Sequence, residues 1–282
     1  LSGCVDETAQ DELQTTTQHT EAANGVSLNG VSLNGVSLNG VSLNGVSLNG
    51  VSLNGVSLNG VSLNGTRTDD GSQLTVDSVG PTLTATLSNG ATLPIKIESA
   101  TQLAGANSDV WSYDVVYQSD SGWSSLCGTG VGALAVAGVW NTDRGVTGGG
   151  AYTATPSSFT FACRGKTIAK CVEFGYKIWT GKTPELTSCV RLMRGDFCGN
   201  GTPYTVDGTT LNLYDHAGIQ TDTNSWMVEG EWTPNGARCI TQPRLSRFQQ
   251  QLGVTPPCAA SLSGGATCGS FANGGLLISE LP

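Results

Sequence analysis

Cysteine is the residue type in this chain whose number and spacing say most about chemistry. The chain holds nine cysteines, of which Cys4 stands far ahead of the other eight. No two of the eight are separated by the two to four residues typical of zinc ligands, and the chain has only two histidines, so we predict four disulfides rather than a metal site. A short loop favours pairing Cys258 with Cys268, and two neighbouring predicted helices favour pairing Cys171 with Cys189. The residues expected to form disulfides are Cys127, Cys163, Cys171, Cys189, Cys198, Cys239, Cys258 and Cys268.

Few other residues suggest a reaction. Asp215 and His216 follow a predicted strand and are the one candidate for a catalytic pair in the sequence. The simpler interpretation is that His216 lies in a turn that faces water. The sequence contains no nucleophile elbow, phosphate loop or His-Glu-x-x-His motif. We therefore expect a non-enzymatic protein without a cofactor. An extracytoplasmic hydrolase with a site near Asp215 and His216 is the alternative.

Three further patterns are better explained by structure than by binding. Arg194-Gly195-Asp196 spells an integrin tripeptide but lies at the end of a predicted helix, beside a cysteine. Asp196, Asn200 and Asp207 lie near glycines, which hints at calcium, but their spacing is not that of a calcium loop, so we expect no metal. Exposed tryptophans can form stacking platforms for glycans. We expect most of the six tryptophans of this chain to lie in the core instead. They are Trp111, Trp123, Trp140, Trp179, Trp226 and Trp232.

The residues around Cys4 suggest a lipid anchor. Leu1-Ser2-Gly3-Cys4 resembles the bacterial lipobox, in which an aliphatic residue and two small residues precede the modified cysteine. The resemblance implies that Cys4 carries a lipid, that residues 1–3 are removed, and that the protein meets a membrane through this lipid. Val5 is not the aspartate that commonly retains lipoproteins at the inner membrane, so we expect the outer membrane or the cell surface.

Two low-complexity segments follow. Residues 5–23 are rich in Thr, Gln and acidic residues and are expected to form a flexible tether. Residues 26–65 are eight identical copies of Val-Ser-Leu-Asn-Gly, which resemble the pentapeptide-repeat family. That resemblance implies that residues 24–65 form a short right-handed quadrilateral β-solenoid of two coils. A disordered spacer is the alternative.

Residues 66–282 alternate between short strands and turns. Strands are predicted over 82–87, 91–97, 110–117, 131–140, 209–214 and 226–232, the first two joined as a hairpin by Ser88-Asn89-Gly90. Helices are predicted over 166–176, 185–197 and 245–252. The expected fold is α+β and β-rich, a disulfide-stapled and mostly antiparallel domain with two or three short helices. A net charge of −9 without a basic face argues against nucleic acid as a partner, and we expect a monomer.

Several stretches of this domain are similar to the ADYC-domain family. The similarity spans roughly residues 105–260, and the tetrad that names the family, Ala-Asp-Tyr-Cys, becomes Gly195-Asp196-Phe197-Cys198. The family consists of extracytoplasmic bacterial proteins often found behind lipoprotein signals and short repeats, so the resemblance implies a compartment and no activity. We therefore expect a lipid-anchored envelope protein that binds or displays a surface ligand, a glycan or a protein. The stretches that carry the resemblance are 159–179, 189–201, 205–208, 211–215 and 231–239.

Overall fold

The structure, a computed structural model, describes most of the chain after residue 91 and two strands before it. Cys4, the tether up to residue 20, the repeat array, the turn at residues 88–90 and the helix predicted over 245–252 lie outside the described residues, so these predictions stay predictions. Residues 21–23, the end of the predicted tether, belong to strand β1 (Glu21–Asn24). The described residues are 21–24, 80, 82–86, 92–119, 121–141, 143–154, 159–205, 209–241, 244, 255–262 and 267–282.

The first sheet confirms the predicted hairpin. Its strand order is β2 (Thr82–Thr86), β3 (Thr92–Gln102), β4 (Trp111–Ser119), β6 (Ala133–Ala137) and β9 (Phe159–Cys163), and all neighbours are antiparallel. A further strand, β5 (Gly122–Ser125), pairs with the C-terminal half of β4. β3 shows why these residues form a strand, because Leu93, Ile95 and Ile97 are buried while the residues between them face outward. β9 was not predicted from the sequence.

The strand predicted over 131–140 is two strands. β6 ends at Ala137, and β7 (Val139–Trp140) pairs with β8 (Tyr152–Thr153) in a separate two-stranded sheet. Gly138 between them has a φ of +84°, and a Cβ there would lie 2.4 Å from the Tyr152 ring. Only glycine fits this break, which turns the chain from one sheet into the next.

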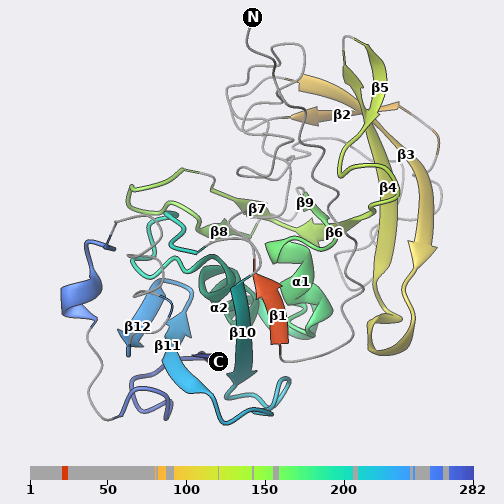
Figure 1. Cartoon of the computed structure of the whole chain (residues 1–282). Helices are drawn as coiled ribbons and strands as arrows, with labels where there is room; N and C mark the ends of the chain where they lie inside the picture. Colours follow the sequence, from red (N-terminus) through yellow and green to blue (C-terminus); the bar gives the residue numbers. More distant parts are fainter. Residues whose placement is uncertain are drawn as a thin grey trace, which may run out of the picture.

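Five strands of the described residues form the second sheet. Its order is β1, β10 (Thr209–Asp215), β13 (Leu277–Leu281), β11 (Met227–Thr233) and β12 (Gly236–Ile240), again antiparallel (Figure 1). β10 and β11 confirm two predicted strands, whereas β12 and the central β13 were not predicted. β13 lies at the centre of this sheet, between β10 and β11, so residues 277–281 join its two halves.

Of the three predicted helices, the two that fall in the described residues are present, with ends shifted by one to three residues. α1 (Thr167–Glu173) ends two residues before Gly175, which has a φ of +102°, and α2 (Thr183–Arg194) starts at a proline-containing first turn and ends at Gly195. One apolar cluster runs from β6 and β9 through both helices to β10, β11 and β13, so the helices are packed between the two sheets (Figure 1). A second cluster fills the other face of the first sheet. The described part is thus α+β and β-rich, as expected. The short 3₁₀ turns are η2 (Gly105–Asn107), η3 (Ile178–Thr180) and η4 (Ala259–Ser261).

Candidate functional site

All eight cysteines after Cys4 are paired. The prediction that Cys171 pairs with Cys189 is confirmed, and this disulfide joins α1 to α2 inside the core. The prediction that Cys258 pairs with Cys268 is wrong. The entropy of closing a loop changes slowly with its length, so a short loop is a weak reason for pairing, and the packing of distant segments decides instead. The four bridges are Cys127–Cys163, Cys171–Cys189, Cys198–Cys258 and Cys239–Cys268.

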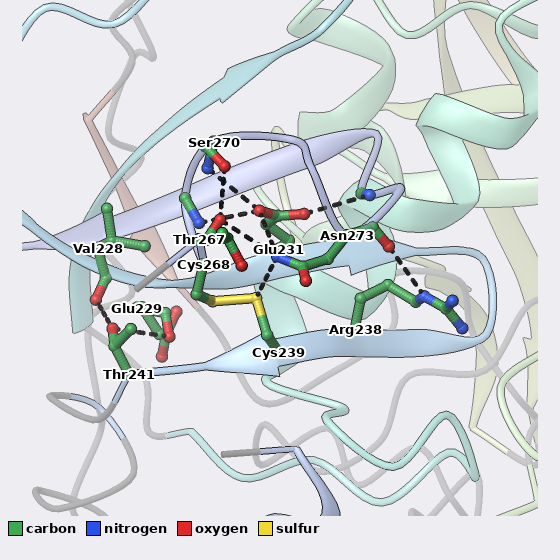
Figure 2. The surroundings of a disulfide bond; sticks show 12 residues. Val228, Glu229, Glu231, Arg238, Cys239, Thr241, Thr267, Cys268, Ser270 and Asn273 are labelled. Atoms are coloured by element: carbon green, nitrogen blue, oxygen red, sulfur yellow. Dashed lines mark hydrogen bonds between the residues drawn. A yellow bond between two sulfur atoms is a disulfide. The ribbon is translucent and has the colours of Figure 1, made fainter. Parts of the chain in front are cut away.

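The bridge between Cys239 and Cys268 is reinforced by a buried carboxylate. Cys239 lies on β12 and Cys268 in the loop that covers this end of the sheet (Figure 2). In that loop the backbone N–H groups of Gly269 and Ser270 donate to Glu231 Oε1 at 2.9 and 3.1 Å. Figure 2 shows Glu231 pointing from β11 into the loop, so one carboxylate and one disulfide fix the same segment.

The tetrad at residues 195–198 ends α2 and holds three segments together. Gly195 has a φ of +62°, and its N–H donates to the carbonyl of Leu192, which closes the helix. The Phe197 ring packs 5.0 Å from the Trp232 ring in the core. Cys198 forms the disulfide with Cys258. The tetrad is therefore a structural junction between α2, β11 and the segment around residue 258.

Asp196 is the polar centre of this junction. Its side chain is 0% exposed and forms an ion pair with Arg191, while the N–H groups of Gly201 and Asn200 donate to it at 2.9 and 3.1 Å. These donors occupy the carboxylate, so the calcium hint at Asp196 receives no support, and Asp207 lies outside the described residues. The arginine of the Arg-Gly-Asp tripeptide is also buried, so the tripeptide is not displayed for docking.

Two more buried arginines surround the end of α2. The loss of water around Arg194 lowers its pKa to about 9, although the nearby Asp196 acts in the opposite direction. Arg244 donates to the carbonyl of Leu192 at 2.8 Å and pairs with Glu229. A positive charge at the carbonyl end of a helix is favourable, so Arg244 stabilises the terminus that carries the tetrad.

Asp215 and His216 do not form a catalytic pair in this structure. Asp215 accepts hydrogen bonds from the Tyr176 hydroxyl at 2.9 Å and from the N–H groups of Ile219 and Gln220 at 3.1 and 2.6 Å, so it fixes a turn. His216 is exposed, and its ring packs edge-to-face at 5.3 Å against Phe271. The carboxylate beside His216 in sequence is thus directed away from it.

The tryptophans divide between core and surface. Only Trp140 and Trp232 are buried, so the expectation that most of the six tryptophans lie in the core is wrong; Trp111, Trp179 and Trp226 are half-buried. The indole N–H of Trp179 donates to Asp109 at 2.8 Å. Trp123 on β5 is 40% exposed, and the Lys96 ammonium lies 5.0 Å from its ring centre. An exposed indole next to a cation can stack on a ligand and hydrogen-bond to it.

Sequence reasoning missed the buried charges of β11 and β13. Glu229 and Glu231 lie in a predicted strand, where two acidic residues between Val228 and Trp232 are unusual, and that pattern was the available signal. Glu280 lies in β13, whose residues are buried on both faces and show no alternation. The partners of these carboxylates come from distant segments.

Comparison with known proteins identifies two regions. The family model described as ADYC domain matches residues 73–246, which is more than half of the chain, and that described as pentapeptide repeats matches residues 25–65 in eight copies. No curated protein and no solved structure matches the chain. Within the described residues, no helix has the length and apolar character needed to cross a membrane.

Proposed function

The chain belongs to the ADYC-domain family, and we propose that it is a lipid-anchored envelope protein whose domain binds a ligand at the cell surface without catalysing a reaction. The observation that carries this proposal is the pairing of all eight cysteines of the domain, which leaves Cys4 as the single cysteine without an assigned partner. Disulfides persist in oxidising compartments, so these four point to an extracytoplasmic location.

The anchor is supported by the residues before Cys4. Leu1-Ser2-Gly3 supply the aliphatic and small side chains that a lipoprotein signal peptidase accepts ahead of its cysteine. A single acyl chain binds a membrane only marginally, so stable anchoring needs the several chains of a bacterial lipoprotein.

Metabolic labelling tests the anchor. Cells that express the protein are grown with a clickable fatty acid, and the wild type is compared with Cys4→Ser and with Ser2→Ala, which keeps a small residue before the cysteine. We expect label on the wild type and on Ser2→Ala and none on Cys4→Ser. Equal labelling of all three proteins would refute the lipid anchor.

A binding role is supported by the exposed aromatic surface of β5. Trp123 and Lys96 present an indole face and a cation on one side of the first sheet. At Asp215 and His216 the carboxylate is engaged by Tyr176 and two backbone N–H groups, so this geometry favours binding over hydrolysis.

Co-sedimentation with purified cell-wall polysaccharide tests the binding surface. Trp123→Ala is expected to weaken binding about tenfold or more, as replacement of a central tryptophan commonly does. Met227→Ala is the matched control, because Met227 is an apolar residue on the other sheet that is 65% exposed, more than Trp123. Equal binding by both variants and the wild type would show that β5 is not the binding surface.

A further inference from the structure

Glu231 lies where the two cysteines of one disulfide meet. Glu231 of β11 is the cross-strand neighbour of Cys239 of β12, so both side chains lie on the same face of the second sheet. Cys268, the partner of Cys239, belongs to residues 267–275, called here the Cys268 loop. The residue after it, Gly269, donates its N–H to Glu231 Oε1 at 2.9 Å. Glu231 is therefore adjacent to one cysteine across the strands and to the other through the loop (Figure 2).

The Cys268 loop encloses the Glu231 carboxylate. The side chain is 0% exposed, and each of the four hydrogen bonds that it receives within the described residues comes from this loop. A buried carboxylate is unfavourable unless donors surround it, so the buried position of Glu231 and the position of the loop depend on each other. The donors are the N–H groups of Gly269 and Ser270 and the Asn273 amide, at 2.9, 3.1 and 3.1 Å from Oε1, and the Gly275 N–H, at 3.3 Å from Oε2.

The amide of Asn273 connects this carboxylate to the sulfur of Cys239. Its Nδ2 group lies 3.1 Å from Glu231 Oε1 and 3.6 Å from Cys239 Sγ, and Figure 2 shows it between the two side chains. The Cys268 loop is thus bound both to the strand that carries Glu231 and to the strand that carries Cys239. These contacts position the loop beside Cys239 by hydrogen bonds that do not require the disulfide.

Cys268 has a nearer competitor for pairing in the sequence. Cys258 precedes it by ten residues, whereas Cys239 precedes it by 29. The entropy cost of closing a loop rises with the logarithm of its length, so in an unfolded chain Cys268 meets Cys258 about fivefold more often than Cys239. In the structure Cys258 is instead bonded to Cys198, 60 residues away. An early bridge between Cys258 and Cys268 therefore withholds both cysteines from their native partners.

We propose that Glu231 selects the partner of Cys268 during oxidative folding, because it binds the Cys268 loop beside Cys239 before the two sulfurs react. In a chain with the wrong bridge, the Cys239 thiolate attacks Cys268 Sγ, the bond between Cys258 and Cys268 breaks, and Cys258 leaves as a thiolate that takes a proton from water. The thiols of Cys198 and Cys258 then form their bridge by reducing a disulfide oxidant, such as glutathione disulfide, to two thiols. Glu231 exchanges no electrons and determines only which sulfurs meet.

Refolding of the reduced full chain tests this role, which does not depend on the lipid anchor or on the proposed binding surface. Every variant carries Cys4→Ser, so the eight cysteines of the domain are the only thiols. The chains are refolded with reduced and oxidised glutathione, alkylated at intervals and mapped by mass spectrometry. We expect native pairing without the substitution and, with Glu231→Gln, at least fivefold more of the bridge between Cys258 and Cys268. In concentrated guanidinium chloride both chains should give the same mixture, since the loop is then unfolded.

Glu229→Gln is the matched control for a general loss of stability. Glu229 lies two residues earlier on β11, is equally buried, and has Arg244 and Ser279 as partners instead of the Cys268 loop. Its neutralisation leaves Arg244 without its buried carboxylate, so the fold is weakened while the loop contacts stay intact. We expect this variant to refold more slowly and to reach native pairing. Equal amounts of the bridge between Cys258 and Cys268 in both variants would assign mispairing to lost stability and overturn the proposal.

Hydrogen exchange separates the binding of the loop from the disulfide itself. In a chain with Cys239→Ser and Cys268→Ser, the N–H groups of Gly269 and Gly275 should remain protected, because both donate to Glu231. Addition of Glu231→Gln should speed their exchange about tenfold or more, since hydrogen bonds to a charged group are lost. Free exchange of both N–H groups in the double-serine chain would show that the disulfide alone positions the loop, and this result would overturn the proposal even if Glu231→Gln failed to refold.

Discussion

The substitution Asp196→Asn tests the structural role of the tetrad most sharply. The change keeps the volume of the side chain and removes its charge, while Arg191 stays buried beside it and the Arg194 guanidinium stays 3.9 Å away. Breaking a buried ion pair by neutralising one partner costs about 3–5 kcal/mol, because it leaves an uncompensated charge without water. The new amide also presents donors to groups that are themselves donors, namely Arg191 and the N–H groups of Asn200 and Gly201. We therefore expect a loss at the upper end of that range.

Chemical unfolding at pH 7 with the disulfides intact measures the effect. For a domain of this size the denaturant dependence in guanidinium chloride is about 4–6 kcal/mol per molar, so a loss of about 5 kcal/mol should lower the midpoint by roughly 0.8–1.3 M at an unchanged slope. Glu185→Gln is the matched control, because it removes the same charge from α2, the helix that the tetrad terminates. Its partner Lys182 has a side chain that is 32% exposed, so the expected loss is at most about 1 kcal/mol.

Equal losses of unfolding free energy for Asp196→Asn and Glu185→Gln would refute the central role of Asp196. A loss below about 1 kcal/mol for Asp196→Asn would mean that Arg191 and Arg194 gain water or other partners when the charge is removed. The tetrad would then be a sequence signature without a central energetic role.

Three further predictions concern other contacts. Gly195→Ala should destabilise the protein by about 1–2 kcal/mol in the same unfolding assay, although alanine is the residue of the family tetrad, because the φ here is +62° and a Cβ would lie 2.8 Å from a carbonyl oxygen. Burial raises the pKa of Asp109, but hydrogen bonds and the charge of Lys177 outweigh burial and hold the pKa below its usual 3.8. Asp109→Asn should therefore cost up to about 1 kcal/mol at pH 7, and the difference from the wild type should vanish as the pH falls through the folded-state pKa; an unchanged difference in acid would contradict this. Mass spectrometry of a non-reduced digest should recover a peptide linked through Cys198 and Cys258, and a free thiol at either residue would contradict the pairing.

The strands and helices that the sequence predicted are those with a local signal in the chain. Apolar residues alternate with polar ones in the sequences of β3 and β10, and α2 has a proline-containing first turn and a glycine just after its end, so local patterns were sufficient. β13 was missed because Leu277–Leu281 is buried along its whole length and contains Ser279 and Glu280. Its polar residues are tolerated only because β10 and β11 supply partners, which no local pattern reveals.

The candidate site, like the fold, could be predicted only in part from the sequence. The parity of the cysteines predicted that eight would be oxidised, and it could not predict that Cys258 pairs with Cys198 across 60 residues. The role of Asp196 was equally hidden, since its environment comes from the folded turn over residues 199–201 and from Arg191. Asp215 followed a predicted strand as a catalytic acid would, but Tyr176, from a distant segment, shares its carboxylate.

Mass analysis of the protein isolated from the cell envelope tests the central claim, an anchored and oxidised extracytoplasmic protein, most directly. We expect an N-terminal peptide that begins at Cys4 and carries diacylglycerol, together with four disulfides in the remainder of the chain. An unmodified Cys4 still preceded by Leu1-Ser2-Gly3, or free thiols among the other eight cysteines, would contradict it.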